Sequence, residues 1–183
     1  LNQVQVLTPM HRGLTGSIHL NQRLQKVFNP TGKGIEFKQW QFRVGDKVMQ
    51  QVNNYDKEVF NGDTGQIREV NTETRELRVE FEHTIVPYTA SELDQLQLSY
   101  AISVHKSQGS EYAAVLLPLT QHHYLMLQRN LLYTAMTRGK ELFVLIGTSE
   151  AVDQAVRTVG TLTRYTALNY ELAEVKRILD KAR

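Results

Sequence analysis

Hydrophobic and polar positions follow two different patterns along the chain, and the change between them predicts its organisation. Near both ends, short apolar runs at residues 4–7, 113–117 and 142–146 are separated by stretches with helical spacing of apolar residues. This alternation is typical of an α/β layer structure. Between residues 37 and 93, apolar and polar residues alternate in short runs separated by turn signals. The middle of the chain therefore favours a small antiparallel β-barrel inserted into an α/β fold.

These patterns predict particular elements. Helices are expected over 17–28, 125–137, 149–159 and 166–179, and strands over 4–7, 98–102, 113–117 and 142–146 in the α/β part and over 47–52, 65–70, 76–81 and 84–88 in the barrel. Thr15 or Ser17 can cap the first helix, and Ser149 can cap the third. The expected division is residues 1–38 and 94–183 for the α/β domain and 39–93 for the barrel. Since the chain begins in an expected strand, we expect it to be part of a longer protein.

The amino-acid composition excludes some classes of protein but does not identify the function. The 183 residues are 41% hydrophobic and 22% charged, with a net charge of +2. Such a weak excess of positive charge permits a nucleic-acid partner but does not argue for one. The chain has no cysteine, which excludes disulfide scaffolds and thiolate metal sites. Its apolar runs are shorter than the ~20 residues that a membrane span needs, so no membrane partner is expected.

The densest group of chemically active side chains lies at residues 103–111. A hydroxyl, an imidazole, an ammonium, an amide, a glycine and a carboxylate occur there just before an apolar strand. Small polar groups and a lysine can hold a phosphodiester backbone. Gly109 would allow a close approach to a ligand, and Glu111 could accept hydrogen bonds from a ribose. The alternative is a polar loop that only caps a helix.

Two arginines stand at ends of predicted elements. Arg12 follows the first strand, where open α/β sheets often bind ligands, but it could equally be an incidental surface residue. Arg138 ends a helical stretch, where it could serve as an arginine finger or simply favour the helix C-terminus. Asn53, Asn54 and Tyr55 in a barrel loop could meet nucleic acid or form a solvated loop. His122 and His123 point in different directions, so a solvated pair is expected there and no metal site.

Five motifs in this order together resemble the C-terminal half of RecD-like DNA helicases, which belong to the 5′-to-3′ branch of superfamily 1 and include the exodeoxyribonuclease V alpha subunit. The motifs are Thr-Pro-Met-x-Arg-Gly, Gly-Asp-Lys-Val-Met-Gln, Val-Phe-Asn-Gly-Asp-x-Gly, Val-His-Lys-Ser-Gln-Gly-Ser-Glu and Leu-Tyr-Thr-Ala-Met-Thr-Arg. The resemblance covers residues 4 to about 179. It implies a RecA-like parallel-sheet motor domain interrupted by a small Src-homology-3-like barrel.

The resemblance also implies roles for particular residues. Arg12 (motif IV) and Arg138 (motif VI) would both reach the γ-phosphate of ATP bound on a first motor domain. Gly109 and Glu111 would lie near the nucleotide. Motif V and its surroundings would hold single-stranded DNA, and the residues expected there are Ser103, His105, Lys106, Ser107, Gln108, Asn53, Tyr55 and Thr134. Tyr133, Thr134 and Thr137 would support the Arg138 loop. Ser103 stands where the family often has threonine, which preserves the hydroxyl.

The sequence lacks the motifs that bind the phosphates and the Mg²⁺ of a nucleotide. It contains no G-x-x-x-x-G-K-[ST] loop and no cluster of carboxylates for Mg²⁺. We therefore expect ATP and Mg²⁺ to belong to a full-length DNA helicase, with neither bound by this chain alone. Expected partners are single-stranded DNA, the N-terminal motor domain of the same protein and other recombination subunits, in the bacterial cytoplasm. The rival interpretation is a stand-alone nucleic-acid-binding or protein-docking module without motor activity.

Overall fold

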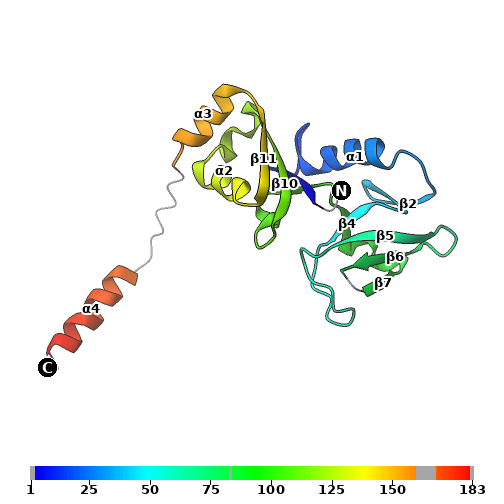
Figure 1. Ribbon diagram of the computed structural model, residues 1–183. Helices are drawn as coiled ribbons and strands as arrows, with labels where there is room; N and C mark the ends of the chain where they lie inside the picture. Colours follow the sequence, from blue (N-terminus) through cyan, green and yellow to red (C-terminus); the bar gives the residue numbers. More distant parts are fainter. Residues whose placement is uncertain (1–2, 83, 160–167, 182–183) are drawn as a thin grey trace.

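The computed structural model describes residues 3–82, 84–159 and 168–181 (Figure 1). Its helices are α1 Ser17–Phe28, α2 Arg129–Met136, α3 Ser149–Arg157 and α4 Leu168–Lys181, with 3-10 turns η1 Ala90–Gln95, η2 His105–Ser107 and η3 Gln121–Met126. Its strands are β1 Val4–Thr8, β2 Gly34–Phe37, β3 Trp40–Arg43, β4 Lys47–Gln50, β5 Thr64–Asn71, β6 Glu76–Phe81, β7 Thr84–Tyr88, β8 Leu96–Leu98, β9 Ala101–Ser103, β10 Tyr112–Leu119 and β11 Gly139–Gly147.

Four parallel strands in the order β11-β10-β1-β9 form the sheet of the α/β unit. Alternate residues of β10 are fully buried, as expected for a strand with one face in a core. Helices α2 and α3 supply much of the rest of this core, whose members include Leu7, Ile102, Val115, Leu117, Leu119, Leu131, Leu132, Ala135, Ala151 and Ala155. This sheet confirms the predicted α/β fold.

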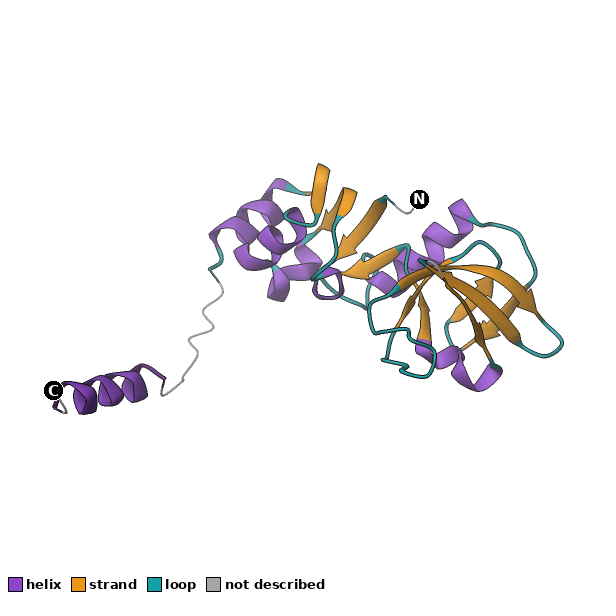
Figure 2. Ribbon diagram, turned by 60° about the horizontal axis from the view of Figure 1, so that its bottom comes forward, coloured by secondary structure: helices purple, strands orange, loops and turns teal. Residues whose placement is uncertain are grey.

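The barrel has its own core. Its strands pair antiparallel in the order β7-β6-β5-β4-β8, beside a β2-β3 hairpin, and Figure 2 shows these strands on one side of the molecule. In β6 every second residue is buried, which matches the alternation in the sequence. The largest members of the second core include Trp40, Phe42, Ile67, Leu77, Tyr88 and Leu98.

The barrel sheet extends past residue 93, because β8 pairs with β4, and one predicted strand is wrong. Residues 98–102 form no single strand: β8 ends at Leu98 in the barrel and β9 begins at Ala101 in the parallel sheet. The Ser99 N–H donates to the Lys47 carbonyl at 2.8 Å. The chain therefore passes from one sheet to the other within two residues, and apolar character alone cannot show this change.

The turn at residues 44–46, expected as ordinary turn chemistry, is a buried junction. The Asp46 carboxylate accepts hydrogen bonds from Gln25 at 2.5 Å, Asn29 at 2.7 Å and the Tyr100 hydroxyl at 2.9 Å. Burial raises the pKa of Asp46. Next to it, the buried Lys47 Nζ donates to Gln5 Oε1 at 2.8 Å. These contacts attach the barrel to α1, β1 and the segment before β9.

Helix ends differ from the prediction in three places. The N-cap of α1 is Gly16, with no side-chain cap, because the chain packs so closely that a Cβ there would lie 2.4 Å from the Arg12 carbonyl oxygen. Thr148 caps α3 in place of Ser149, accepting from the Ala151 N–H at 3.4 Å. The stretch 125–137 is broken into η3 and α2 by extended backbone at Gln128.

The last predicted helix corresponds to α4, which lies apart from both units in Figures 1 and 2. Its prediction began at residue 166, and residues 166 and 167 lie outside the described part of the chain. No helix in the described ranges combines the length and apolar composition needed to cross a bilayer.

Candidate DNA and nucleotide interface

Residues 103–111, called the motif V segment below, run from one end of the parallel sheet to the other. Ser103 ends β9, and η2 follows at once. The segment then returns to Tyr112, which begins β10 at the opposite end of the sheet. Gly109 has a φ of 85°, a left-handed conformation that favours glycine. Glycine is therefore needed here for the turn itself.

Two serines of this segment shape the turn. Ser103 and Ser107 are buried. The Lys106 N–H donates to Ser103 Oγ at 3.2 Å, and Ser107 Oγ donates to the Val104 carbonyl at 2.7 Å. Both were expected to contact DNA, but the structure turns these hydroxyls inward.

Lys106 connects the motif V segment to the barrel. Its Nζ donates to Gln51 Oε1, and the Gln51 N–H donates to the Gln95 carbonyl at 2.7 Å. Partial burial lowers the pKa of Lys106. The contact spans 55 residues of sequence, so no local signal could have predicted Gln51 as a partner.

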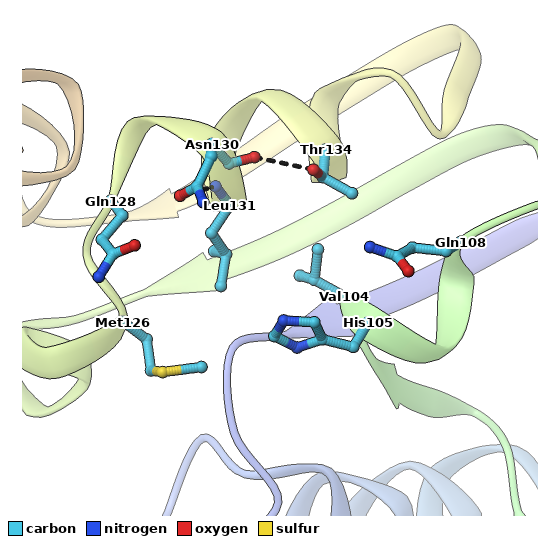
Figure 3. Close-up of a pocket in the computed structure, with 8 residues that line it drawn as sticks. All are labelled: Val104, His105, Gln108, Met126, Gln128, Asn130, Leu131 and Thr134. Carbon is cyan, nitrogen blue, oxygen red and sulfur yellow. Dashed lines mark hydrogen bonds between the residues drawn. The ribbon is translucent and has the colours of Figure 1, made fainter. Parts of the chain in front are cut away.

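His105 and Gln108 face α2 across a pocket of about 130 Å³ (Figure 3). Asn130 and Thr134 line the opposite wall, where the Thr134 hydroxyl donates to the Asn130 carbonyl at 2.8 Å. The structure thus brings together three predicted residues, His105, Gln108 and Thr134. Asn130 was missed, although its position one helical turn before Thr134 could have indicated it.

Arg138 joins α2 to the far end of the motif V segment. Its Nε donates to the Thr134 carbonyl, its Nη1 to the Ser110 carbonyl and its Nη2 to Thr137 Oγ1, each at 3.2 Å. These bonds occupy only part of the donor fork. Thr134 and Thr137 do support this loop, whereas the Tyr133 side chain is exposed.

Glu111 lies in the same neighbourhood. The Lys140 ammonium is 2.9 Å from its carboxylate. Lys140 and, less strongly, Arg138 lower the pKa of Glu111. The carboxylate is therefore ionised and exposed beside two cations, at the amino ends of β10 and β11.

Arg12 lies at the other end of the sheet. It follows β1, whose Val6 pairs with Leu116, so the end of β1 at Thr8 is level with Pro118. Gly139, directly after Arg138, pairs with Tyr112. Pro118 is six residues beyond Tyr112 (118 − 112), which is about 20 Å along a strand. Arg12 therefore follows the carboxyl end of the parallel sheet, whereas Arg138 precedes its amino end.

His123 corrects the expectation of a solvated histidine pair. It is 1% exposed, while His122 is exposed. Its Nδ1 accepts from the Thr120 N–H at 3.2 Å, and its Nε2 lies 2.8 Å from Thr15 Oγ1. Burial, with His122 nearby, lowers the pKa of His123. The neutral ring therefore donates from Nε2 to Thr15 and ties η3 to the loop that carries Arg12.

The barrel loop after β4 presents aromatic side chains. Tyr55 is 75% exposed and packs edge-on against Phe60, with ring centroids 5.9 Å apart. Asn53 Oδ1 accepts from the Asn61 N–H at 2.9 Å. Tyr55 thus remains available for contact, while the Asn53 side chain shapes the loop.

The residues present do not form a nucleotide site by themselves. Within the described ranges, no three histidine or acidic residues come together as metal ligands, and the sequence lacks a phosphate-binding loop. The chain instead places Arg138, Glu111 and Lys140 at one end of the parallel sheet.

Comparisons with known proteins agree with this geometry. A sequence model of the ATP-dependent RecD-like DNA helicase SH3 domain matches residues 20–81, and one of the UvrD-like helicase C-terminal domain matches residues 98–146. The ATP-dependent RecD2 DNA helicase of Deinococcus radiodurans is 45% identical over 81% of this chain, which covers 20% of that protein. The RecBCD enzyme subunit RecD of Mycobacterium tuberculosis is 29% identical over 85% of this chain and is covered to 27%.

A solved structure shows the same fold. The Pif1 helicase from Bacteroides, in complex with ADP-AlF3 and single-stranded DNA, superimposes on 96% of this chain with a TM-score of 0.60 at 16% identity. This chain covers 46% of that one. The α/β unit is therefore RecA-like and the inserted barrel is Src-homology-3-like. The chain spans about a fifth to a quarter of the length of the curated relatives described above.

Proposed function

Because the chain is the C-terminal motor region of a RecD-like superfamily 1 DNA helicase, we propose that it supplies one half of an ATP-dependent 5′-to-3′ motor. In this role it grips single-stranded DNA and completes a nucleotide site on another motor domain. The carrying observation is the path of the motif V segment. One end holds His105 and Lys106, and the other end receives the Arg138 guanidinium at Ser110.

Arg138 is the residue that we propose to act on nucleotide. Its fork is held by three bonds that fix its direction yet leave donors available. Glu111, exposed and ionised nearby, is suited to accept hydrogen bonds from ribose hydroxyls. ATP and Mg²⁺ would be held by the N-terminal motor domain, and the bound nucleotide would supply the phosphoryl chemistry.

Arg12 does not share this role in our proposal. The strand ends next to which Arg12 and Arg138 lie are at opposite ends of the parallel sheet, about 20 Å apart along the strands. The loop of Arg12 borders the face that carries His105 and Lys106, so we assign Arg12 to the DNA side.

The DNA grip is proposed for the exposed donors of this region. His105 and Gln108 are exposed, and Lys106 is half-buried beside the barrel. Contacts from such groups to phosphates hold a strand without reading its sequence. The names of the relatives also suggest partners, because one is a RecBCD subunit and the Pif1 structure contains single-stranded DNA.

A displacement of the Arg138 side chain would be transmitted to the DNA-binding residues along the short stretch of backbone from Ser110 to His105. When a nucleotide attracts the guanidinium, its bond to the Ser110 carbonyl changes, and Ser110 is five residues from His105. The fixed turn at Ser103 and Ser107 transmits this displacement because its hydroxyls are already engaged.

Steady-state ATPase of the full-length parent tests the proposal. Arg138→Ala should lower DNA-stimulated turnover about 10³–10⁵-fold, the range measured for arginine fingers, with DNA affinity largely kept. Arg138→Lys should not rescue, since a lysine lacks the planar fork. Arg129→Ala is the matched control, because this exposed arginine begins the same helix.

Unchanged turnover in Arg138→Ala would contradict the motor role and favour the stand-alone binding module. The 183-residue chain alone should show no ATPase activity. It should bind single-stranded DNA weakly, with an affinity that falls as salt rises.

A further inference from the structure

A large groove lies at the carboxyl ends of β1 and β9, separate from the small pocket of Figure 3 although His105 and Met126 border both. Its volume is about 780 Å³. Three segments line it: the loop after β1, the start of the motif V segment, and η3.

The two sides of this groove differ in chemistry. The η3 side presents Tyr124, 62% exposed, and Leu125, 70% exposed, beside Met126, with His122 and the buried His123 before them. The other side combines the apolar Pro9 and Met10 with the polar rings of His11 and His105 and the ammonium of Lys106. Among the described residues that line the groove, none is acidic.

The η3 side is held rigidly before any ligand arrives. The buried His123 fixes η3 to Thr15 at 2.8 Å, and Gln154 of α3 donates to the Tyr124 carbonyl at 3.4 Å. A wall fixed in advance loses little freedom on binding. Exposed aromatic groups on such a support are suited to stacking.

We propose that this groove holds a base of single-stranded DNA against Tyr124 and Leu125, while Lys106 and His105 hold the adjoining phosphate. This inference deepens the proposed function and rests on it. A nucleotide matches both walls because its base has an apolar face and its phosphate is anionic. Every base has such a face, so the contact is tolerant of sequence.

Fluorescence anisotropy of the 183-residue chain with two labelled oligonucleotides tests the site. One is oligo-dT and the other is an abasic strand of the same length. Tyr124→Ala should weaken oligo-dT binding roughly 5- to 150-fold, as expected for loss of one stacked base, and leave the abasic strand unaffected. Tyr124→Phe should bind like the wild type, because the ring remains.

Two controls separate this inference from the backbone grip. Lys106→Ala should weaken both strands and reduce the salt slope by about one. Ile85→Ala, which removes an exposed apolar side chain from β7 in the barrel, should change neither. Circular dichroism checks that each variant is folded.

Equal loss on both strands in Tyr124→Ala would overturn the base site, as would no loss on either. If Tyr124→Ala failed in either of these ways while Lys106→Ala still weakened binding of both strands, the proposed backbone grip would survive. The groove would then be a contact for another protein domain. Failure of the wild-type chain to bind either strand would overturn both proposals.

Discussion

Single residues at the junction between the two units carry more of the structure than their local sequence indicates. Lys47 stands next to the Gly45-Asp46 turn and was expected only to begin a strand. In the fold its ammonium is buried, 2.8 Å from Gln5 Oε1 and 5.9 Å from the centre of the Tyr112 ring. Burial lowers the pKa of Lys47 to about 8. The pKa of this barrel residue thus depends on its burial against the parallel sheet.

Lys47 should make stability depend on pH in a defined window. Its pKa is about 8 in the folded chain and 10.5 when exposed, so between these values the unfolded chain holds a proton that the folded chain lacks. The free energy of unfolding should therefore rise with pH from 8 to 10.5, by about 3 kcal/mol in total. Below pH 8 both states are protonated and this gain is absent.

Urea unfolding at several pH values measures this effect. The wild type should gain stability across the window relative to Lys47→Met, which cannot titrate. Lys26→Met, at an exposed lysine of α1, should keep the wild-type slope. Parallel curves for the wild type and Lys47→Met would show that burial does not shift the pKa.

At the level of elements, the sequence predicted what depends on local pattern. Apolar runs gave β1, β10 and β11, and alternation gave β6 and β7 with their observed bounds. The pattern missed the β2-β3 hairpin and the break between β8 and β9, because these depend on pairing with distant strands. Likewise, the site motifs were visible in sequence, but the placement of Arg12 and Arg138 next to opposite ends of the sheet follows only from the parallel register.

Gly16 shows how tightly two elements can meet at this site. A Cβ at this position would lie 2.4 Å from the Arg12 carbonyl oxygen and 2.6 Å from that of His11. Gly16→Ala should therefore force the loop that carries Arg12 away from α1, costing roughly 1–3 kcal/mol of stability.

Thermal unfolding of Gly16→Ala should show a lower Tm than the wild type. Thr31→Ala, an exposed substitution after the same helix, should leave the Tm unchanged. A wild-type Tm in Gly16→Ala would mean that the loop can relax without cost.

On the scale of the whole molecule, the two hydrophobic cores adjoin at a buried junction, where Asp46 bonds to α1 and Tyr100 and Lys47 bonds to Gln5 of β1. The barrel core contains Trp40, the sole tryptophan of the sequence. The α/β core contains α2 and α3. Tryptophan fluorescence therefore reports on the barrel core, and the part of the helical circular dichroism that comes from α2 and α3 reports on the α/β core.

Asp46→Ala should separate the unfolding of the two cores. It leaves the buried donors of Gln25 and Tyr100 without their acceptor, at about 1–3 kcal/mol for each unsatisfied group. In the wild type, the fluorescence and circular dichroism transitions in urea should coincide. In Asp46→Ala the fluorescence transition should come first.

Asp56→Ala, at an exposed barrel residue, should keep the two transitions together. Coincident transitions in Asp46→Ala would show that the junction does not couple the cores.

The path of the motif V segment also has a mechanical consequence. In the proposed function, a DNA strand pulled backwards at His105 would strain the residues from His105 to Ser110, whose carbonyl accepts a hydrogen bond from Arg138. If the two sites act as proposed, their coupling is reciprocal in binding free energy, so an opposing force on the DNA would weaken the binding of nucleotide beside Arg138. A motor built as proposed would bind nucleotide less tightly when its DNA is held back, without a separate regulatory element.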